Sequence, residues 1–361
     1  MPPFNPELYV AMFKDGTAPF IRNVQTKLAI WETSGHPFPV TVNDAEWDNC
    51  YVCSPYTHYV SYASEECCKL GSKFARDSLR LVLKGLGHWL KRAELNRCVH
   101  INNFLLSTNL YPDWDGSGVV NLHERALDEH PDHTIIFRSL NRLQNTPLIL
   151  ALLRLGYWLL PTRRVWLVDG AEKGNITRRR DFKNDNHIRL RSGLRHVTHD
   201  EFQDSDLLRA SELYNLLYLD KYSLHNPQFT VDYMRYCHLN HLLNFHGLRD
   251  TDGQLCGVTG GFMRGRTITT PILGYDTSQP QERGLYRILT NIVMRETAEN
   301  GWLMNLSAGA GQFKRSRGGC PEIEYSAVYN QHLPSYRQRP WHFLRWISER
   351  CAIPLMEKYD L

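Results

Sequence analysis

A glycine-containing turn that leads into an amphipathic helix is the clearest candidate for chemistry in this sequence. The turn is Gln281–Tyr286 (QERGLY), and the expected helix runs from there to Asn300 and Gly301. The first turn of a helix has unpaired backbone N–H groups and a partial positive charge, so an anion is favoured there. Gly284 allows close approach to the backbone, and Arg283 adds a full charge. The pattern predicts either a phosphate-binding turn or a plain helix start.

The residues after this turn have the spacing of a helix with one apolar face. The apolar face consists of Leu285, Ile288, Leu289, Ile292 and Val293, and the charged residues Arg287, Arg295 and Glu299 fall mostly on the other side. Such a helix packs its apolar face on a core. The packing would fix the position of the turn.

The elements expected around the turn alternate between helices and strands. Helices are expected at 176–194 and 206–223, with a short strand at 195–202 between them. Residues 241–276 predict antiparallel strands, with hairpin turns at Asp250–Gly253 and near Gly265. After the helix that starts at Leu285, strands are expected at 303–307 and 323–329, with a glycine-rich turn and a short helix between them.

The first half of the chain has a similar alternation. Helices are expected within 67–96, 120–133 and 146–156, and strands within 98–114 and 134–141, with a pair of strands in 158–170. A chain of 361 residues is long enough for two domains. We place them at 1–170 and 171–361.

The order of elements in the second half, together with the turn, resembles the GNAT superfamily of acyltransferases, most closely its tandem-domain members related to Fem-type peptidyltransferases. The resemblance covers residues 176–334 and is supported by TPILGYD before the turn and by NLSAGAGQFKRSRGG and EIEYSAVY after it. The first half resembles the same fold more weakly. The resemblance implies an α/β fold with mainly antiparallel sheets, helices on both faces and two GNAT-like domains in tandem.

The resemblance also implies where an acyl donor binds. The donor would lie along Ile272, Leu273 and Gly274, with its pyrophosphate on Gln281, Arg283, Gly284, Leu285 and Tyr286 and a cation from Lys314 nearby. No tightly bound cofactor is expected, because acyl-CoA or a phosphopantetheine thioester is a co-substrate. Tyr286 stands where the superfamily has a small residue, and its phenol crowds the pyrophosphate position. A carrier-protein thioester and an aminoacyl-tRNA therefore stay open as donors.

Acyl transfer to an amine needs a base, donors for the oxyanion and an acid for the leaving group. The candidates for catalysis are Tyr329, Tyr325, Asp276 and Glu324, and those for acceptor binding are Tyr222, Asn226, Ser307 and His332. Alternation along the strand puts Tyr325 and Tyr329 on one face and Glu324 on the other, so they cannot all face one site. Asp276 could instead cap a turn, and the tyrosines could be core aromatics.

Charge and cysteine content narrow the class of protein. The net charge is +4, and the basic residues gather within 171–196, which fits either a solvated helix or contact with phosphates. Nine cysteines without a secretory leader indicate reduced thiols in the cytoplasm, and we expect no metal site. The apolar run 147–161 contains Arg154 and is shorter than the roughly 20 residues that span a bilayer, so no membrane partner is expected. We expect no DNA partner either.

These observations predict an N-acyltransferase that moves an acyl or aminoacyl group to a small-molecule amine by direct attack, within specialised-metabolite biosynthesis. Cys256 and Cys320 have no histidine pattern around them, which speaks against a covalent route. A thioester on CoA or on an acyl carrier protein is the first expected donor, and aminoacyl-tRNA is the alternative. A non-catalytic GNAT-like module that binds an acidic protein or RNA is the alternative from another class.

Overall fold

The computed structural model describes residues 4–62, 65, 84–172, 174–354 and 356. Their strands form one sheet in the order β1-β2-β3-β4-β11-β5-β10-β9-β8-β7-β6. The strands are β1 (Lys27–Thr33), β2 (His36–Asn43), β3 (Cys98–Ile101), β4 (Thr134–Asn141), β5 (Trp158–Asp169), β6 (Arg195–Val197), β7 (Asn244–Arg249), β8 (Leu255–Arg264), β9 (Thr267–Tyr275), β10 (Leu303–Asn305) and β11 (Cys320–Tyr329). Most neighbouring strands are antiparallel.

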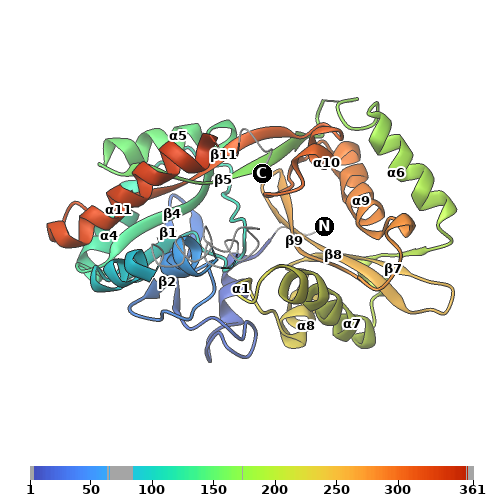
Figure 1. Ribbon diagram of the computed structural model, residues 1–361, viewed down its shortest axis with the longest axis horizontal. Helices are drawn as coiled ribbons and strands as arrows, with labels where there is room; N and C mark the ends of the chain where they lie inside the picture. Colours follow the sequence, from blue (N-terminus) through green and yellow to red (C-terminus); the bar gives the residue numbers. More distant parts are fainter. Residues whose placement is uncertain (1–3, 63–64, 66–83, 173, 355, 357–361) are drawn as a thin grey trace.

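Helices flank this sheet along its whole length (Figure 1). They are α1 (Pro6–Ala11), α4 (Val119–Glu129), α5 (Arg142–Arg154), α6 (Arg180–Arg191), α7 (Asp204–Asn215), α8 (Val231–Leu239), α9 (Leu285–Asn300), α10 (Gly311–Arg315) and α11 (Ser335–Ile347), with shorter helical turns η1 (Thr57–Ser61), η2 (His199–Glu201), η3 (Leu216–Tyr222), η4 (Gln281–Arg283) and η5 (Ser348–Ala352). The prediction of a mixed α/β fold is confirmed. Among the described residues, no helix is long and apolar enough to cross a membrane.

The same order of elements occurs twice along the chain. Each half has three antiparallel strands, a helix, a strand parallel to the third one, a helix and a long last strand. The first half uses β1-β2-β3, α4, β4, α5 and β5, and the second uses β7-β8-β9, α9, β10, α10 and β11. This repetition confirms the expectation that the second half repeats the order of elements of the first.

The two halves exchange their last strands. β5 comes from the first half but pairs with β10, and β11 comes from the second half but pairs with β4. The two exchanged strands also pair with each other, and in Figure 1 they run through the centre of the molecule. The predicted domain boundary at residue 170 falls directly after β5. It remains a prediction, because the sheet continues without interruption from one half to the other.

One expectation about local structure is corrected, and one pair of strands is added. Residues 158–169 form the single strand β5 and not a pair of strands. The pairing between β5 and β11 shifts its register between Glu324 and Tyr325, beside Pro161, and β5 continues through this shift. The first strand pair, β1 with β2, was not expected. Of the helices expected within 67–96, residues 84–92 are helical, and the segment 66–83 lies outside the described residues.

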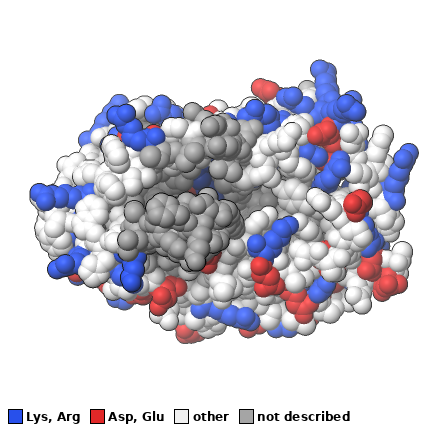
Figure 2. Space-filling view, in the orientation of Figure 1, with Lys and Arg blue, Asp and Glu red and all other residues white. Residues whose placement is uncertain are grey.

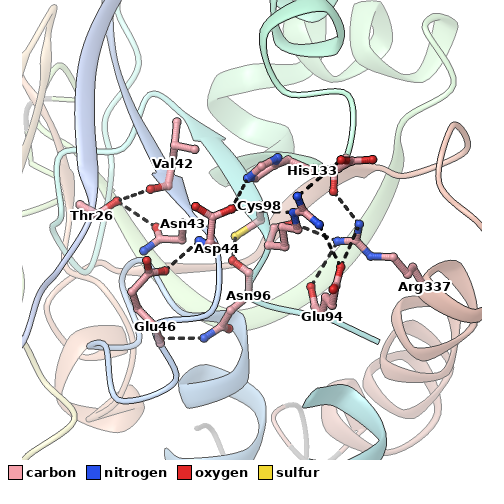
Figure 3. A network of polar contacts seen from close by, with 12 residues as sticks. Thr26, Val42, Asn43, Asp44, Glu46, Glu94, Asn96, Cys98, His133 and Arg337 are labelled. Atoms are coloured by element: carbon pink, nitrogen blue, oxygen red, sulfur yellow. Dashed lines mark hydrogen bonds and ion pairs between the residues drawn. The ribbon is translucent and has the colours of Figure 1, made fainter. Parts of the chain in front are cut away.

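The two faces of the first half's sheet have different surroundings. On β4, Ile135 and Phe137 pack with residues of α4 and α5, whereas Ile136 packs with Trp341 of α11. A polar network next to α11 holds this helix in place (Figure 3). In that network His133 Nε2 lies 3.1 Å from Asp44 Oδ1, and Arg337 Nη1 lies 3.4 Å from Glu94 Oε2. α11 therefore forms a fixed cover over one face of the sheet.

Candidate functional site

A cavity opens where β9 and β10 separate. The two parallel strands pair only from Thr267 to Thr269, and β9 then continues to Tyr275 without a partner on this side. The space between the strands is a cavity of about 460 Å³, and Thr270 and Leu273 of β9 line it. The helix α9 lines it as well, through four residues that are Tyr286, Leu289, Thr290 and Val293. The splayed strands thus form a site large enough for a small molecule.

Both halves of the chain contribute aromatic walls to this cavity. The tyrosines that line it are Tyr51 and Tyr62 from the first half and Tyr218, Tyr222, Tyr275 and Tyr286 from the second. Burial raises the pKa of Tyr286 to about 12, so its phenol keeps its proton at neutral pH and can donate a hydrogen bond. The walls are therefore apolar rings with neutral hydroxyl groups, a lining suited to stacking and to oxyanion contacts.

Lys314 is the strongest candidate for a proton acceptor in this cavity. It lies on α10, only 3% of it is exposed, and its Nζ donates to the carbonyl oxygens of Ser307 (3.1 Å) and Ala308 (2.7 Å). Burial, together with the nearby charge of Arg163, lowers the Lys314 pKa to about 7. A lysine with this pKa has a large neutral fraction at neutral pH, so it can take up a proton there.

A chain of polar contacts connects Ser307, whose carbonyl oxygen accepts from Lys314, with Glu324 of β11. Arg163 donates from Nε to Glu324 Oε1 (2.8 Å) and from Nη2 to Thr108 Oγ1 (2.8 Å). Thr108 Oγ1 then lies 3.3 Å from Ser307 Oγ. Glu324 is only 3% exposed, so its charge and that of Arg163 offset each other inside the protein. The pair fixes the guanidinium at the cavity wall.

The turn 281–286 satisfies part of its own backbone. The N–H groups of Arg283 and Gly284 donate to the carbonyl oxygens of Pro280 (3.1 Å) and Gln281 (3.0 Å). Gly284 has a φ of +66°, and a Cβ added to it would lie 3.1 Å from Ile188 Cγ2 of α6. The turn is therefore a tight, partly covered helix start with two amides already bonded. Its role as a pyrophosphate site stays a prediction.

Helix α6 is fixed beside this turn. Its Asp185 is only 1% exposed and accepts from Arg287 Nε of α9 (2.6 Å) and from Arg317 Nε (2.5 Å). Lys and Arg side chains gather at the edge of the molecule beside α6 (Figure 2). Four of them, Arg178, Arg180, Lys183 and Arg191, form no ion pair with a carboxylate of the described residues. The buried ion pairs thus hold a basic surface next to the turn.

Six of the residues expected from the sequence meet in the cavity. They are Leu273, Tyr286, Lys314, Tyr222, Asn226 and Ser307. Ile272 is fully buried in the core next to them, and Gly274 packs against α7, where an added Cβ would lie 2.5 Å from the backbone of Leu213. Leu285 is the first residue of α9 and packs in the core, while Gln281 and Arg283 lie on the turn outside the cavity.

The remaining expected residues do not line the cavity. Tyr329 stacks on His332 with 5.4 Å between ring centroids and packs at 4.6 Å on His123 in the core of the first half. The structure therefore does not bring these two to the site, because β11 belongs to the other half's sheet. Tyr325 lies under the guanidinium of Arg142, 5.9 Å away.

Asp276 and Glu324 have structural contacts. Asp276 Oδ1 accepts from the backbone N–H (3.1 Å) and the hydroxyl (2.6 Å) of Ser278, as expected for a residue that caps a turn. Both contacts and the charge of Arg209 lower its pKa although partial burial acts in the other direction. Glu324 reaches the cavity only through Arg163.

Sequence reasoning missed Arg163 and the tyrosines of the first half. Arg163 and Arg164 interrupt an apolar strand (WLLPTRRVWLVD), and this interruption was the available signal. In the part of the chain that the structure describes, no group of three His, Cys, Asp or Glu residues could hold a metal ion.

Comparisons with known proteins concern the fold. No protein-family model matches the sequence, and no curated protein matches it either. Among solved structures, the C-terminal domain of a putative lysylphosphatidylglycerol synthetase from Agrobacterium fabrum is similar, with 15% identity, a TM-score of 0.47 and coverage of 64% of this chain and 77% of that one. FemX has 8% identity and a TM-score of 0.47, over 60% of this chain and 77% of its own. A tandem GNAT protein from the clavulanic acid pathway has 14% identity and a TM-score of 0.35, over 66% and 76%.

Proposed function

We propose that the chain transfers an acyl or aminoacyl group from an activated donor to the amine of a small molecule, with the reaction in the cavity between β9 and β10. The observation that carries the proposal is the buried Lys314, whose pKa of about 7 makes it a base at neutral pH. An attacking amine must lose a proton, and Lys314, which lines the cavity, can take it up. The neutral tyrosine hydroxyls supply donors for the oxyanion.

The donor favoured by the site is an aminoacyl-tRNA. Two amides of the turn 281–286 are bonded within the turn, and Ile188 covers Gly284, which leaves fewer backbone donors for a CoA pyrophosphate. The basic surface beside α6 suits a polyphosphate backbone. A thioester on a carrier protein or on CoA is the second candidate, because Leu273 of β9 and Tyr286 both line the cavity.

The test supplies each donor class in turn. Purified protein is incubated with tRNA charged with a mixture of labelled amino acids, with labelled acetyl-CoA or with acetyl-phosphopantetheine carrier protein, and with a panel of amines as acceptors. We expect transfer from charged tRNA, with the loss of most of the rate in Lys314→Met. Lys14→Met is the matched control, because the Lys14 side chain is 79% exposed and does not line the cavity.

Two outcomes would contradict the proposal in different ways. Transfer from acetyl-CoA alone would keep the enzyme class and overturn the tRNA donor. Binding of tRNA without transfer to any acceptor, equally in wild type and Lys314→Met, would make the chain a binding module.

A further inference from the structure

A second, smaller cavity lies on the other side of Arg163. It has a volume of about 30 Å³ and lies between the face of β3, β4, β11 and β5 and the helix α11, whose Trp341 lines it. Arg163 and Tyr51 line both this cavity and the larger one. The two cavities are therefore neighbours that share one wall.

The smaller cavity has more positive than negative charge. Its described lining contains Arg138, Arg163 and one carboxylate, Glu324, together with His58 and His100. Burial is the main cause that lowers the pKa of both histidines, that of His58 to about 3, so both are neutral. Glu324 uses both oxygens on Arg163, at 2.8 and 3.2 Å. One positive charge is left over, and it belongs to Arg138.

Among the described residues, Arg138 donates to neutral acceptors and forms no ion pair of its own, although the charge of Glu324 acts on it from a distance. Arg138 Nη1 donates to the carbonyl oxygen of Val52 (2.5 Å) and lies 3.4 Å from Asn103 Oδ1. No carboxylate of residues 4–62, 65, 84–172, 174–354 and 356 forms an ion pair with it. A charge inside a protein without a partner is costly, so such a site gains free energy when an anion binds.

The size of the cavity limits the anion. A volume of 30 Å³ is room for roughly two or three water-sized groups, at about 10–15 Å³ for each. The two oxygens of a carboxylate fit this space, and a planar guanidinium binds them well. Nucleotides and lipid headgroups are too large to enter, and inorganic phosphate is the small alternative.

We propose that Arg138 binds a carboxylate of the acceptor, so that the acceptor is a compound with both a carboxylate and an amine. The carboxylate occupies the small cavity, and the amine lies on the other side of Arg163 and Tyr51, where Lys314 deprotonates it; the two groups of the acceptor are therefore separated by a spacer and are not on neighbouring atoms. This inference rests on the proposed function for the role of the ligand, but the binding site itself can be tested without transfer.

The test measures binding by calorimetry and by thermal shift, so it does not depend on turnover. The probes are amino acids whose carboxylate and amine are separated by a spacer, their carboxamides and inorganic phosphate. For at least one amino acid, we expect the acid to bind about ten-fold tighter than its carboxamide, because a charged hydrogen-bond pair is lost in the amide. In Arg138→Met this preference should fall to less than about two-fold, while Arg138→Lys should keep part of it.

Stability and specificity controls keep the result interpretable. Arg138→Met should fold, since Val52 O and Asn103 Oδ1 have other donors in Asn103 Nδ2 and Leu105 N. Arg22→Met replaces an exposed arginine and should leave the preference unchanged. The proposal is overturned if no acid binds better than its amide, if the preference survives in Arg138→Met, or if phosphate alone binds through Arg138. Carboxylate binding without any transfer would refute the proposed function and leave this site standing.

Discussion

At the scale of single residues, the proposed chemistry depends on a lysine that burial makes a base. We predict that Lys314→Met lowers kcat by about 10²–10⁴-fold with little change in KM, as for the loss of a general base. Because the neutral amine is the active form and its pKa is about 7, kcat/KM should rise as pH increases through that value and then level off. Rates measured across this pH range would show the rise in wild type.

Lys314→Arg separates this lysine from other titrating groups. A guanidinium stays charged throughout the range, so the variant should lose both rate and the rise near pH 7. If the same rise persists in Lys314→Arg, it belongs to the acceptor amine or to another group.

A second prediction at this scale concerns the ion pair of Arg163 and Glu324. Glu324→Gln should lower the free energy of unfolding by about 3 kcal/mol, because it leaves the buried Arg163 without its carboxylate partner. Urea unfolding measures the change. The matched control is Glu299→Gln, whose partner Arg295 lies 3.3 Å away on the surface of α9, and it should cost less than about 0.5 kcal/mol. Equal costs would mean that water screens the Arg163 pair as well.

The sequence identified part of this site through local rules. Lys314 was expected here because it lies near the start of a short helix after a glycine-rich turn, and Tyr222 and Asn226 because the resemblance puts the loop after their helix beside the acceptor. Tyr329 was expected at the site but does not line the larger cavity, and Arg163 lines it but was not expected, for the same physical reason. Alternation along a strand tells which residues share a face, but not which half's sheet the strand will join.

At the scale of elements, the junction between η4 and α9 combines a left-handed backbone with a neighbouring side chain. Gly284→Ala should lower the free energy of unfolding by more than the roughly 1–2 kcal/mol of a left-handed alanine, because the new Cβ also meets Ile188 at 3.1 Å. Gly193→Ala is the matched control, with a φ of +69° and no atom within 4 Å. Urea unfolding of both variants should show the larger loss at Gly284.

Removing the side chain of Ile188 tests whether its contact with the new Cβ causes the larger loss of unfolding free energy in Gly284→Ala. In an Ile188→Ala background, the cost of Gly284→Ala should fall to that of Gly193→Ala. An excess that remains in this background would point to strain in the turn itself rather than to its contact with α6.

The elements of the second half were predictable because local signals agree there. The apolar stripe of α9 and the Asp-Gly turn between β7 and β8 both appear in the structure at the expected places. β1 and β2 were missed because prolines and a glycine in SGHPFPV indicate a turn, yet Pro37 and Pro39 both lie within β2. Pairing with β1 on one side and β3 on the other fixes that strand, and such partners are distant in sequence.

At the scale of the whole molecule, strand exchange makes the two halves depend on each other. β11 is paired on one side with β4 and on the other with β5, both from the first half. The larger cavity also needs both halves, since Tyr51, Tyr62 and Arg163 line it together with residues of the second half. The two repeated halves thus form one continuous sheet, and both line the larger cavity.

This dependence predicts how the chain behaves when it is divided. Full-length protein should unfold in urea in a single transition, and fragments 1–170 and 171–361 should each fail to give a folded species alone, because β5 and β11 would expose unpaired edges. Co-expressed, they should form a complex that unfolds like the intact chain. The control pair, 1–170 with 171–319, lacks β11 and should not reconstitute, because β4 and β5 lose the strand between them. A folded 171–361 fragment, or two separate transitions in the intact chain, would mean that the exchanged strands contribute little and that each half carries its own stability.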